Sequence, residues 1–490
     1  MTSSSRCSST TSGSAPFLMT AEITARSLGS KPISCTEPRC GINVAKVRLT
    51  LAILACGVDL VGMRVVVIII FMQLLAAAVM QAQDGIGPEI PIVLENADSL
   101  IGSGTVDASV RTFQGNVRFS QGNVTGRCDR AVHDVVRNTI ELTGSVLIRQ
   151  SEMTIAAPSV RYDGRVSIAY APRGLRVDQG RMSITSRTGR YDLRRRIAVF
   201  QQNVHAVDDS TRIWCDSLVH DRTVDTMLAV GSVVIQDSGR HSWFGADQAR
   251  RDANAGTLRL TGSARAWTWQ HGRGQSADTV FIAADEMRTE SAGESLTRRM
   301  IAIGNVRLVR AEAAATSGKM EYSDGDSLID LTESPVVWSD SSVLVAASIQ
   351  ARSSGGEIRT IVGDGDAVLI SRSDTLLPER YDQIVGKRIT IAIQPDSVKM
   401  LTASGDAQSI TFRQESGDRK GLAKVAADTI NATIVDNALT DVFWLGGVSG
   451  ENHPERLVSG REAEFTVPGF RLPPRRPIYE PAPIRRSMLR

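Results

Sequence analysis

The chain has few of the residues that usually carry chemistry or bind nucleic acid. Its 490 residues include six histidines, and aromatic residues make up only 5%. The low aromatic content gives no support to base-stacking platforms, so we expect no nucleic-acid partner. The histidines are dispersed without ligand spacing to one another, at His133, His205, His220, His241, His271 and His453.

The motifs of common enzyme classes are also missing. The sequence has no Gly-x-Ser-x-Gly elbow, no phosphate-binding Gly-Lys-Ser/Thr loop and no His-Glu-x-x-His helix. A calcium β-roll needs repeated Gly-rich nonapeptides, whereas the run Gly363-Asp-Gly-Asp366 occurs once. We therefore predict a protein that is not an enzyme, with no catalytic residue, no metal and no cofactor.

No apolar run has the length of an ordinary membrane-spanning helix. The longest, residues 65–78, has about fourteen residues where a span needs about twenty. It follows Met63-Arg64 and precedes small residues and then Gln83-Asp84, which is the layout of a secretory signal peptide. We predict a leader over residues 1–62 that is absent from the mature protein, a signal peptide over 63–83, and export of the remaining chain. An uncleaved N-terminal anchor is the alternative.

What the sequence does contain is a repeat. A Gly, Asn or Ser turn followed by Val or Ala recurs from Gly115, with steps of 29 residues to Gly144, 58 to Gln202 and 29 to Gly231. Further copies begin at Gly262, Gly304, Gly365 and Gly405. Self-similarity at a period of about 30 residues is typical of an elongated array whose units touch mainly their neighbours.

Apolar residues alternate within each unit, which is typical of a strand with one buried face. The second and fourth residues after the turn are the clearest cases: Val117 and Phe119, Val146 and Ile148, Val233 and Ile235, and Val306 and Leu308. The alternation returns in mid-unit: Val160 and Tyr162, Leu258 and Leu260, Met320 and Tyr322, Ile329 and Leu331, and Ile389, Ile391 and Ile393. We predict an all-β, solenoid-like stack of antiparallel strands.

Polar residues mark the turns between these strands. The Asp-Gly pairs at 163–164 and 324–325 suit tight hairpins. Aspartates also recur in the middle of the units, where we interpret them as turn formers with Asx hydrogen bonds: Asp129, Asp216, Asp247, Asp285 and Asp428.

The spacing of the repeats suggests how the chain is divided. The step from Gly262 to Gly304 is longer than the earlier ones, so we predict one repeat block over 84–270 and a second over 271–460. A tail follows over 461–490; residues 468–490 hold six arginines and six prolines against one acidic residue. That composition predicts an extended and mobile segment rather than a packed one.

Cys128 and Cys215 lie three units apart, so we expect them to be too far from each other for a disulfide.

Several motifs together resemble one family. They are the repeated Gly-Asn-Val turns, the mid-unit Ala-Asp or Cys-Asp pairs, the Tyr-Asp-Gly turn, and the segments 278–285, 303–306, 335–340 and 383–387. Over about residues 90–450 the chain resembles the OstA-like (organic solvent tolerance A) lipopolysaccharide-transport periplasmic proteins, in a long variant. The resemblance implies an elongated β-jelly-roll whose apolar interior carries acyl chains between the inner and outer membranes, either of which the protein could associate with.

The resemblance also implies partners: lipopolysaccharide or a related glycolipid, and other lipopolysaccharide-transport proteins of related fold. An apolar groove is physically reasonable, because an acyl chain in water costs about 0.8 kcal/mol per CH₂ group. Unpaired edge strands at the ends of the array would allow head-to-tail self-association. The candidate groove residues are Val117, Phe119, Val146, Ile148, Val233, Ile235, Val306, Leu308, Ile391 and Ile393.

The same alternation also fits a second hypothesis. The inward side chains may serve only to pack against one another, since any stacked β-structure must bury apolar residues. The protein would then be a non-catalytic structural β-solenoid, a scaffold or surface protein with a sealed core. The sequence leaves an open groove and a sealed core as alternatives.

Overall fold

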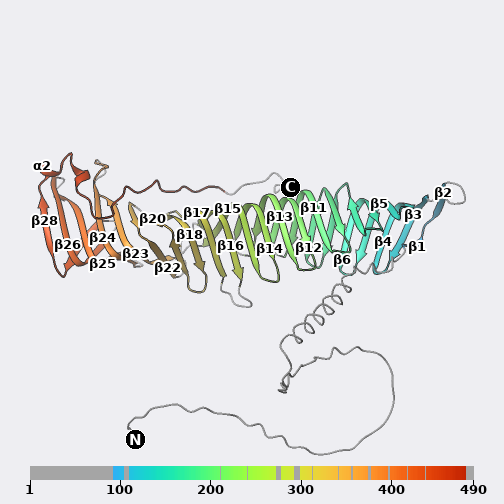
Figure 1. Cartoon of the computed structure of the whole chain (residues 1–490), viewed down its shortest axis with the longest axis horizontal. Coiled ribbons are helices and arrows are strands. Elements are labelled where there is room, and N and C mark those ends of the chain that lie inside the picture. The colour runs from blue at the N-terminus through green and yellow to red at the C-terminus, as the bar shows by residue number, and fades with distance from the viewer. Residues whose placement is uncertain are drawn as a thin grey trace, which may run out of the picture. The chain divides into compact units, whose positions relative to one another are not determined.

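The computed structural model describes residues 92–481, except for 104–109, 210, 240, 272–276, 292–297, 312, 340, 355–356, 374–376, 395–397, 416–417 and 436–437. The predicted leader and signal peptide, and residues 482–490, lie outside the described residues. Residues 86–490 form one compact unit. This unit is built almost wholly from antiparallel strands that succeed one another from β1 to β28 (Figure 1). The prediction of an all-β stack is confirmed.

The strands of the first half fall into a short and a long class, of four or five and of eleven or twelve residues. They are β1 (Val93–Asn96), β2 (Ser99–Ser103), β3 (Val110–Gln121), β4 (Val124–Asp134), β5 (Thr139–Gln150), β6 (Met153–Asp163), β7 (Ile168–Ala171), β8 (Leu175–Gln179), β9 (Met182–Ser186), β10 (Thr188–Asp192), β11 (Ile197–Asp208), β12 (Thr211–Asp221), β13 (Thr226–Asp237) and β14 (Ser242–Asp252).

The second half contains the longest strands and the only helical turns among the described residues. The strands are β15 (Thr257–His271), β16 (Ala277–Ser291), β17 (Arg298–Val309), β18 (Ala313–Ser323), β19 (Leu328–Thr332), β20 (Val336–Ser339), β21 (Ser342–Val345), β22 (Ser348–Ser354), β23 (Glu357–Arg372), β24 (Tyr381–Ile393), β25 (Lys399–Glu415), β26 (Asp418–Val435), β27 (Ala438–Leu445) and β28 (Ser449–His453). Helix α2 (Glu455–Val458) and the 3₁₀ turn η1 (Glu462–Glu464) follow.

Each long strand contributes to two layers. In β11, for example, residues 197–201 pair with β10, whereas residues 205–207 pair with β9. We call the layer that contains β2, β7, β10, β19, β22 and β27 layer A, and the layer that contains β1, β8, β9, β20, β21 and β28 layer B. The inward side chains of both layers form the core.

A corner in the middle of each long strand leads from one layer to the other. In β13 the corner is Gly231-Ser232, where both residues have positive φ (84° and 41°) and the pairing register shifts. Glycine is needed because a Cβ at Gly231 would collide with the Asp216 carboxylate of the neighbouring strand. The Gly-Asn and Gly-Ser pairs that the sequence marks as unit boundaries are therefore corners within strands.

The mid-unit aspartates are not turn formers, and that prediction was wrong. Asp216 lies within β12 and Asp285 within β16, each against the corner glycine of the next strand. The Asn305 side chain donates a hydrogen bond to Asp285 Oδ2 at 2.8 Å, which ties two corners together. The Asp-Gly pairs do form hairpin turns, as predicted, and the backbone N–H of Arg165 donates to Asp163 Oδ1 at 3.0 Å.

One apolar interior extends through most of the array. It contains buried side chains from Met153 in β6 to Ala432 in β26, and a second cluster around Leu142 and Val117 fills the first strands. Strand pairing continues across residues 271–300, where β15 pairs with β16 and β16 with β17. The strand order thus continues from one predicted block into the next, and the division into two repeat blocks stays a prediction.

No disulfide joins Cys128 and Cys215, both of which are buried.

The C-terminal segment does not behave as its composition predicts. It begins with a buried anchor, in which the Arg380 guanidinium donates to Glu455 Oε1 at 2.7 Å and to Glu462 Oε1 at 3.0 Å. The backbone N–H of Val467 donates to Gln383 Oε1 at 2.9 Å. From there the segment returns along the strands toward the middle of the array (Figure 1).

The far end of the described segment is anchored on layer B of the central strands. Trp267 Nε1 donates to the Glu480 carbonyl at 2.8 Å, and the Glu480 side chain pairs with Arg265 at 3.1 Å and Arg307 at 2.9 Å. Trp267 alternates with the inward Ala266 on β15, so these contacts lie on the outer face. The tail is extended, but the prediction that it does not pack was wrong for residues 468–481.

Candidate functional site

The ten predicted groove residues all face the interior. Val117, Phe119 and Val146 belong to the cluster of the first strands, and Val233, Ile235 and Val306 belong to the main cluster. The remaining four are partly buried and pack against these clusters: Ile148, Leu308, Ile391 and Ile393. The structure therefore places all ten on one continuous face, while their contact with lipid remains a prediction.

The interior around the first strands is almost completely filled. Two cavities there have volumes of only about 40 Å³ and 30 Å³. The first is lined by Phe119, Leu142 and Tyr162, and Ile148 and Tyr191 line both. Bulky inward side chains thus occupy most of the interior in this part.

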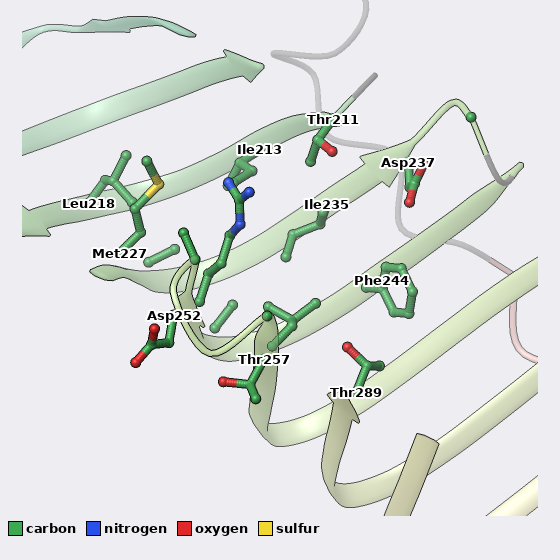
Figure 2. A pocket seen from close by; sticks show the side chains of 17 residues that line it. Thr211, Ile213, Leu218, Met227, Ile235, Asp237, Phe244, Asp252, Thr257 and Thr289 are labelled. Carbon is green, nitrogen blue, oxygen red and sulfur yellow. The ribbon is translucent and has the colours of Figure 1, made fainter. Parts of the chain in front are cut away.

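The interior of the central strands is open. A cavity of about 450 Å³ lies between layer A and layer B of β12–β16, within the range of roughly 300–1,000 Å³ that is typical of small-molecule sites. Figure 2 shows the labelled side chains on the strands and turns around this space. The depth of the cavity is apolar, lined by Ile213, Leu218, Met227, Ala229, Ile235, Phe244, Ala249 and Leu258.

The mouth of this cavity is polar. Hairpin turns of both layers border it, and they contribute Asp237 and Gly239 on one side and Asp252 and Gly256 on the other. Asp252 is held in its turn because its Oδ1 accepts a hydrogen bond from the Ala255 backbone N–H at 2.9 Å. An apolar depth with a polar rim is the arrangement that an amphiphile requires.

Two arginines make contacts from layer A to layer B, and one of them, Arg251, lines the cavity. Arg251 Nη1 lies 3.4 Å from Asp208 Oδ2, which projects from the layer B half of β11. Arg222 donates to the Tyr191 hydroxyl at 2.8 Å in layer A and lies 3.3 Å from the Met153 sulfur in layer B. These are contacts between layers, whereas the backbone pairing lies within each layer.

A carboxylate also faces the interior near the C-terminal end of the array. Asp382 alternates with Gln383, which binds the C-terminal segment on the outer face. Burial raises the pKa of Asp382 to about 6, against the opposing effect of the hydrogen bond that it accepts from the Phe412 backbone N–H at 2.8 Å. The charge of the interior at this end therefore depends on pH.

Sequence reasoning identified only part of the cavity. Ile235 was among the ten candidates, and the mid-unit alternation indicates Leu258, but Ala229, Ala249 and Arg251 were not singled out. Ala229 and Ala249 follow the same period-two pattern, yet alanine is a weak apolar signal. Arg251 had no signal, because a charged residue beside a turn is ordinarily read as exposed.

Two further searches cover the described residues only. They contain no cluster of three or more His, Cys, Asp or Glu side chains that could hold a metal ion. Within the same part of the chain, the helices are all too short or too polar to cross a bilayer.

Two protein-family models match the chain, and their residues include the central cavity and eight of the ten predicted groove residues. The family described as OstA-like protein matches residues 89–217, and the family described as LptA/(LptD N-terminal domain) LPS transport protein matches residues 183–356. No curated protein matches the chain. The two matches overlap and together cover more than half of the 490 residues. The chain therefore belongs to the OstA-like family of lipopolysaccharide-transport proteins.

Proposed function

We propose that the protein acts in the periplasm, where it shields acyl chains of lipopolysaccharide or a related glycolipid inside the groove between layers A and B. The observation that carries this proposal is the cavity of about 450 Å³, whose depth is apolar and whose rim is polar. Removing one acyl chain of a dozen carbons from water is favourable by roughly 10 kcal/mol, so such a cavity removes the main barrier to lipid transfer.

The ends of the array support a bridging role between membrane components. Among the described strands, β2 pairs only with β3, and β27 pairs only with β26. Ile101 in β2 and Phe443 in β27 are 53% and 59% exposed. An edge strand with unpaired backbone groups invites strand addition, so these edges would join neighbouring transport proteins of related fold or further copies of this chain.

Site-specific photo-crosslinking tests the lipid-binding proposal. A photoreactive residue replaces Ile235, which lines the cavity, or Gln236, which follows it in β13 and faces the opposite side. In a Gram-negative envelope, the full chain should form a lipopolysaccharide adduct from position 235 and none from 236. Absence of an adduct at position 235 in a folded and exported chain would overturn the proposal.

A structural scaffold with a sealed core is the second candidate. The filled interior around Leu142 and Tyr162 favours it for the first strands. It predicts that neither position 235 nor 236 reaches lipid, and that a charge at Val306, which is 1% exposed, unfolds the protein. The crosslinking result at Ile235 therefore separates the two candidates.

A further inference from the structure

The groove does not offer the same space along its length. The cavities among the first strands have volumes of about 40 Å³ and 30 Å³, whereas the central cavity has about 450 Å³. A chain that moved lengthwise from β1 would have to displace closely packed side chains such as Leu142, which is 1% exposed. Entry from that end is therefore unfavourable.

The central cavity is bordered by hairpin turns from both layers. Gly239 follows β13 in layer B, and Ala253 and Gly256 lie in the turn between β14 and β15 in layer A. Backbone hydrogen bonds join strands within each layer, so nothing in the strand pairing closes the gap between the opposed turns. The gap is therefore a route between the cavity and its surroundings.

A charged contact bridges this gap at the cavity itself. Arg251 lines the cavity from layer A, and its guanidinium meets the Asp208 carboxylate of layer B at 3.4 Å. The two side chains are 43% and 37% exposed, so the ion pair is solvated enough to break and reform. Its members are also on separate layers, so breaking it disrupts no strand pairing.

The corresponding position among the first strands has a different side chain. Tyr162 lies opposite Ile140 in the register of β5 and β6, and Arg251 lies opposite Met227 in the register of β13 and β14. The two strand pairs have the same corner pattern. Tyr162 is 9% exposed and packs into the first apolar cluster. The ionic contact is thus found where the groove has space, and an aromatic ring is found where it is filled.

We propose that acyl chains enter and leave the groove sideways at this central mouth, and that the Arg251–Asp208 ion pair is the latch that holds the mouth closed. The inference rests on the proposed lipid-binding function and adds the route and the gating contact. The ligand class is an amphiphile with a long acyl chain. Arg222 makes a second contact between the layers, with the Met153 sulfur at 3.3 Å.

A reversible cross-link across the mouth tests the proposal. Cysteines replace Asp208 and Arg251 in a full chain that also carries C128A and C215A, and a cleavable bis-maleimide joins them. The control joins cysteines at Arg259 and Glu286, an ion pair of 2.7 Å between neighbouring strands of layer A that does not span the mouth. The probe is a pyrene-labelled long-chain fatty acid, and its uptake is followed by fluorescence.

The latch predicts that the mouth cross-link slows probe uptake at least about tenfold, equivalent to 1.4 kcal/mol, and that cleavage of the linker restores it. Probe loaded before cross-linking should be retained. The control cross-link should leave uptake and release unchanged. Equal uptake with the mouth linked and unlinked would overturn the proposal, whereas failure of every variant to take up probe, with no lipopolysaccharide adduct at Ile235, would overturn the lipid-binding function itself.

A gentler variant provides a second readout that does not depend on the linker. Asp208→Asn removes the ion pair without removing the side chain, and uptake should become roughly two- to fivefold faster, as expected for an exposed pair. Thermal unfolding of this variant should match that of the parent chain. Slower or unchanged uptake by a folded Asp208→Asn protein would contradict a latch.

Discussion

The hairpin of β5 and β6 and the hairpin of β13 and β14 are built in the same register but enclose different interiors. Both have a Gly-Ser corner, and their inward residues pair in the same way across the two strands. The first hairpin faces a filled core, and the second faces a cavity of about 450 Å³. The matched positions are Leu142 and Ala229, Val160 and Ala249, Tyr162 and Arg251, and Met153 and Ser242.

This comparison shows that the repeat determines the shape of the groove, whereas the size of a few inward side chains determines whether it is open. The corners and hydrogen bonds are equivalent in the two hairpins, so the backbone alone does not create the cavity. Two alanines replace a leucine and a valine, and an arginine at the rim replaces a tyrosine. On the proposed function, lipid binding would therefore depend on residue volume at fixed register positions.

The largest expected effect comes from opening the filled hairpin. Leu142→Ala gives the first hairpin the residue that the second has at this position, and should reduce the free energy of unfolding by about 2–5 kcal/mol, because it leaves a cavity in a packed cluster. Val136→Ala, at a side chain that is 77% exposed, serves as the control. Denaturant unfolding measures both, and a loss below about 1 kcal/mol for Leu142→Ala would show that the first interior is not close-packed.

A pH-dependent effect is expected at the far end of the groove. Because the pKa of Asp382 is raised to about 6, the folded state binds a proton that the unfolded state releases between about pH 4 and 6. The free energy of unfolding is therefore highest, as far as Asp382 is concerned, below about pH 4, and it falls as the pH rises through about 6 because the buried carboxyl group then ionises. Asp382→Asn should remove this dependence and raise stability at pH 7 by at most about 3 kcal/mol.

Urea unfolding at pH 4 and pH 7 measures the effect of Asp382→Asn. The control is Asp406→Asn, at a carboxylate that is 81% exposed and pairs with Lys387 on the surface. An equal pH response in the parent chain and in Asp382→Asn would exclude a buried carboxylate at this end of the groove.

A smaller effect is expected from filling the open hairpin. The double variant Ala229→Leu and Ala249→Val gives the central cavity the side chains of the first hairpin. Lipopolysaccharide binding should weaken by about tenfold, or 1.4 kcal/mol, since space for the chain is lost. Val230→Leu adds a methylene group on the outer face of the same strand and should not change binding. Unchanged affinity in the folded double variant would place the lipid elsewhere.

The smallest effect is expected on the outer face of layer A. Arg259 donates to both carboxylate oxygens of Glu286, at 2.9 Å and 2.7 Å, and holds the pKa of Glu286 below its usual value. The Arg259 side chain is 51% exposed, so Arg259→Gln should cost no more than about 1 kcal/mol and leave lipid uptake unchanged. A loss above about 2 kcal/mol on thermal unfolding would mean that the outer face is less solvated than its exposure indicates.

The sequence predicts the inward face well because period-two alternation is a local property. The alternation of Val233 and Ile235 with their immediate neighbours predicts which way their side chains point. The Gly231-Ser232 pair likewise predicts positive φ from local sequence alone. The contact of Glu480 with Trp267 cannot be read from the sequence, because proline-rich composition predicts an extended chain but not the surface on which it lies. The position of the cavity was equally hidden, since it depends on side chains from both layers that meet only in the folded array.

Photo-crosslinking from matched positions of the two hairpins tests the central claim most directly. Ile148 and Ile235 occupy the same register position, one beside the filled interior and one in the open cavity. With the same photoreactive residue at either position of the full chain in a Gram-negative envelope, we expect a lipopolysaccharide adduct from position 235 and little or none from position 148. Equal adducts from both positions, or an adduct from position 148 alone, would contradict the account.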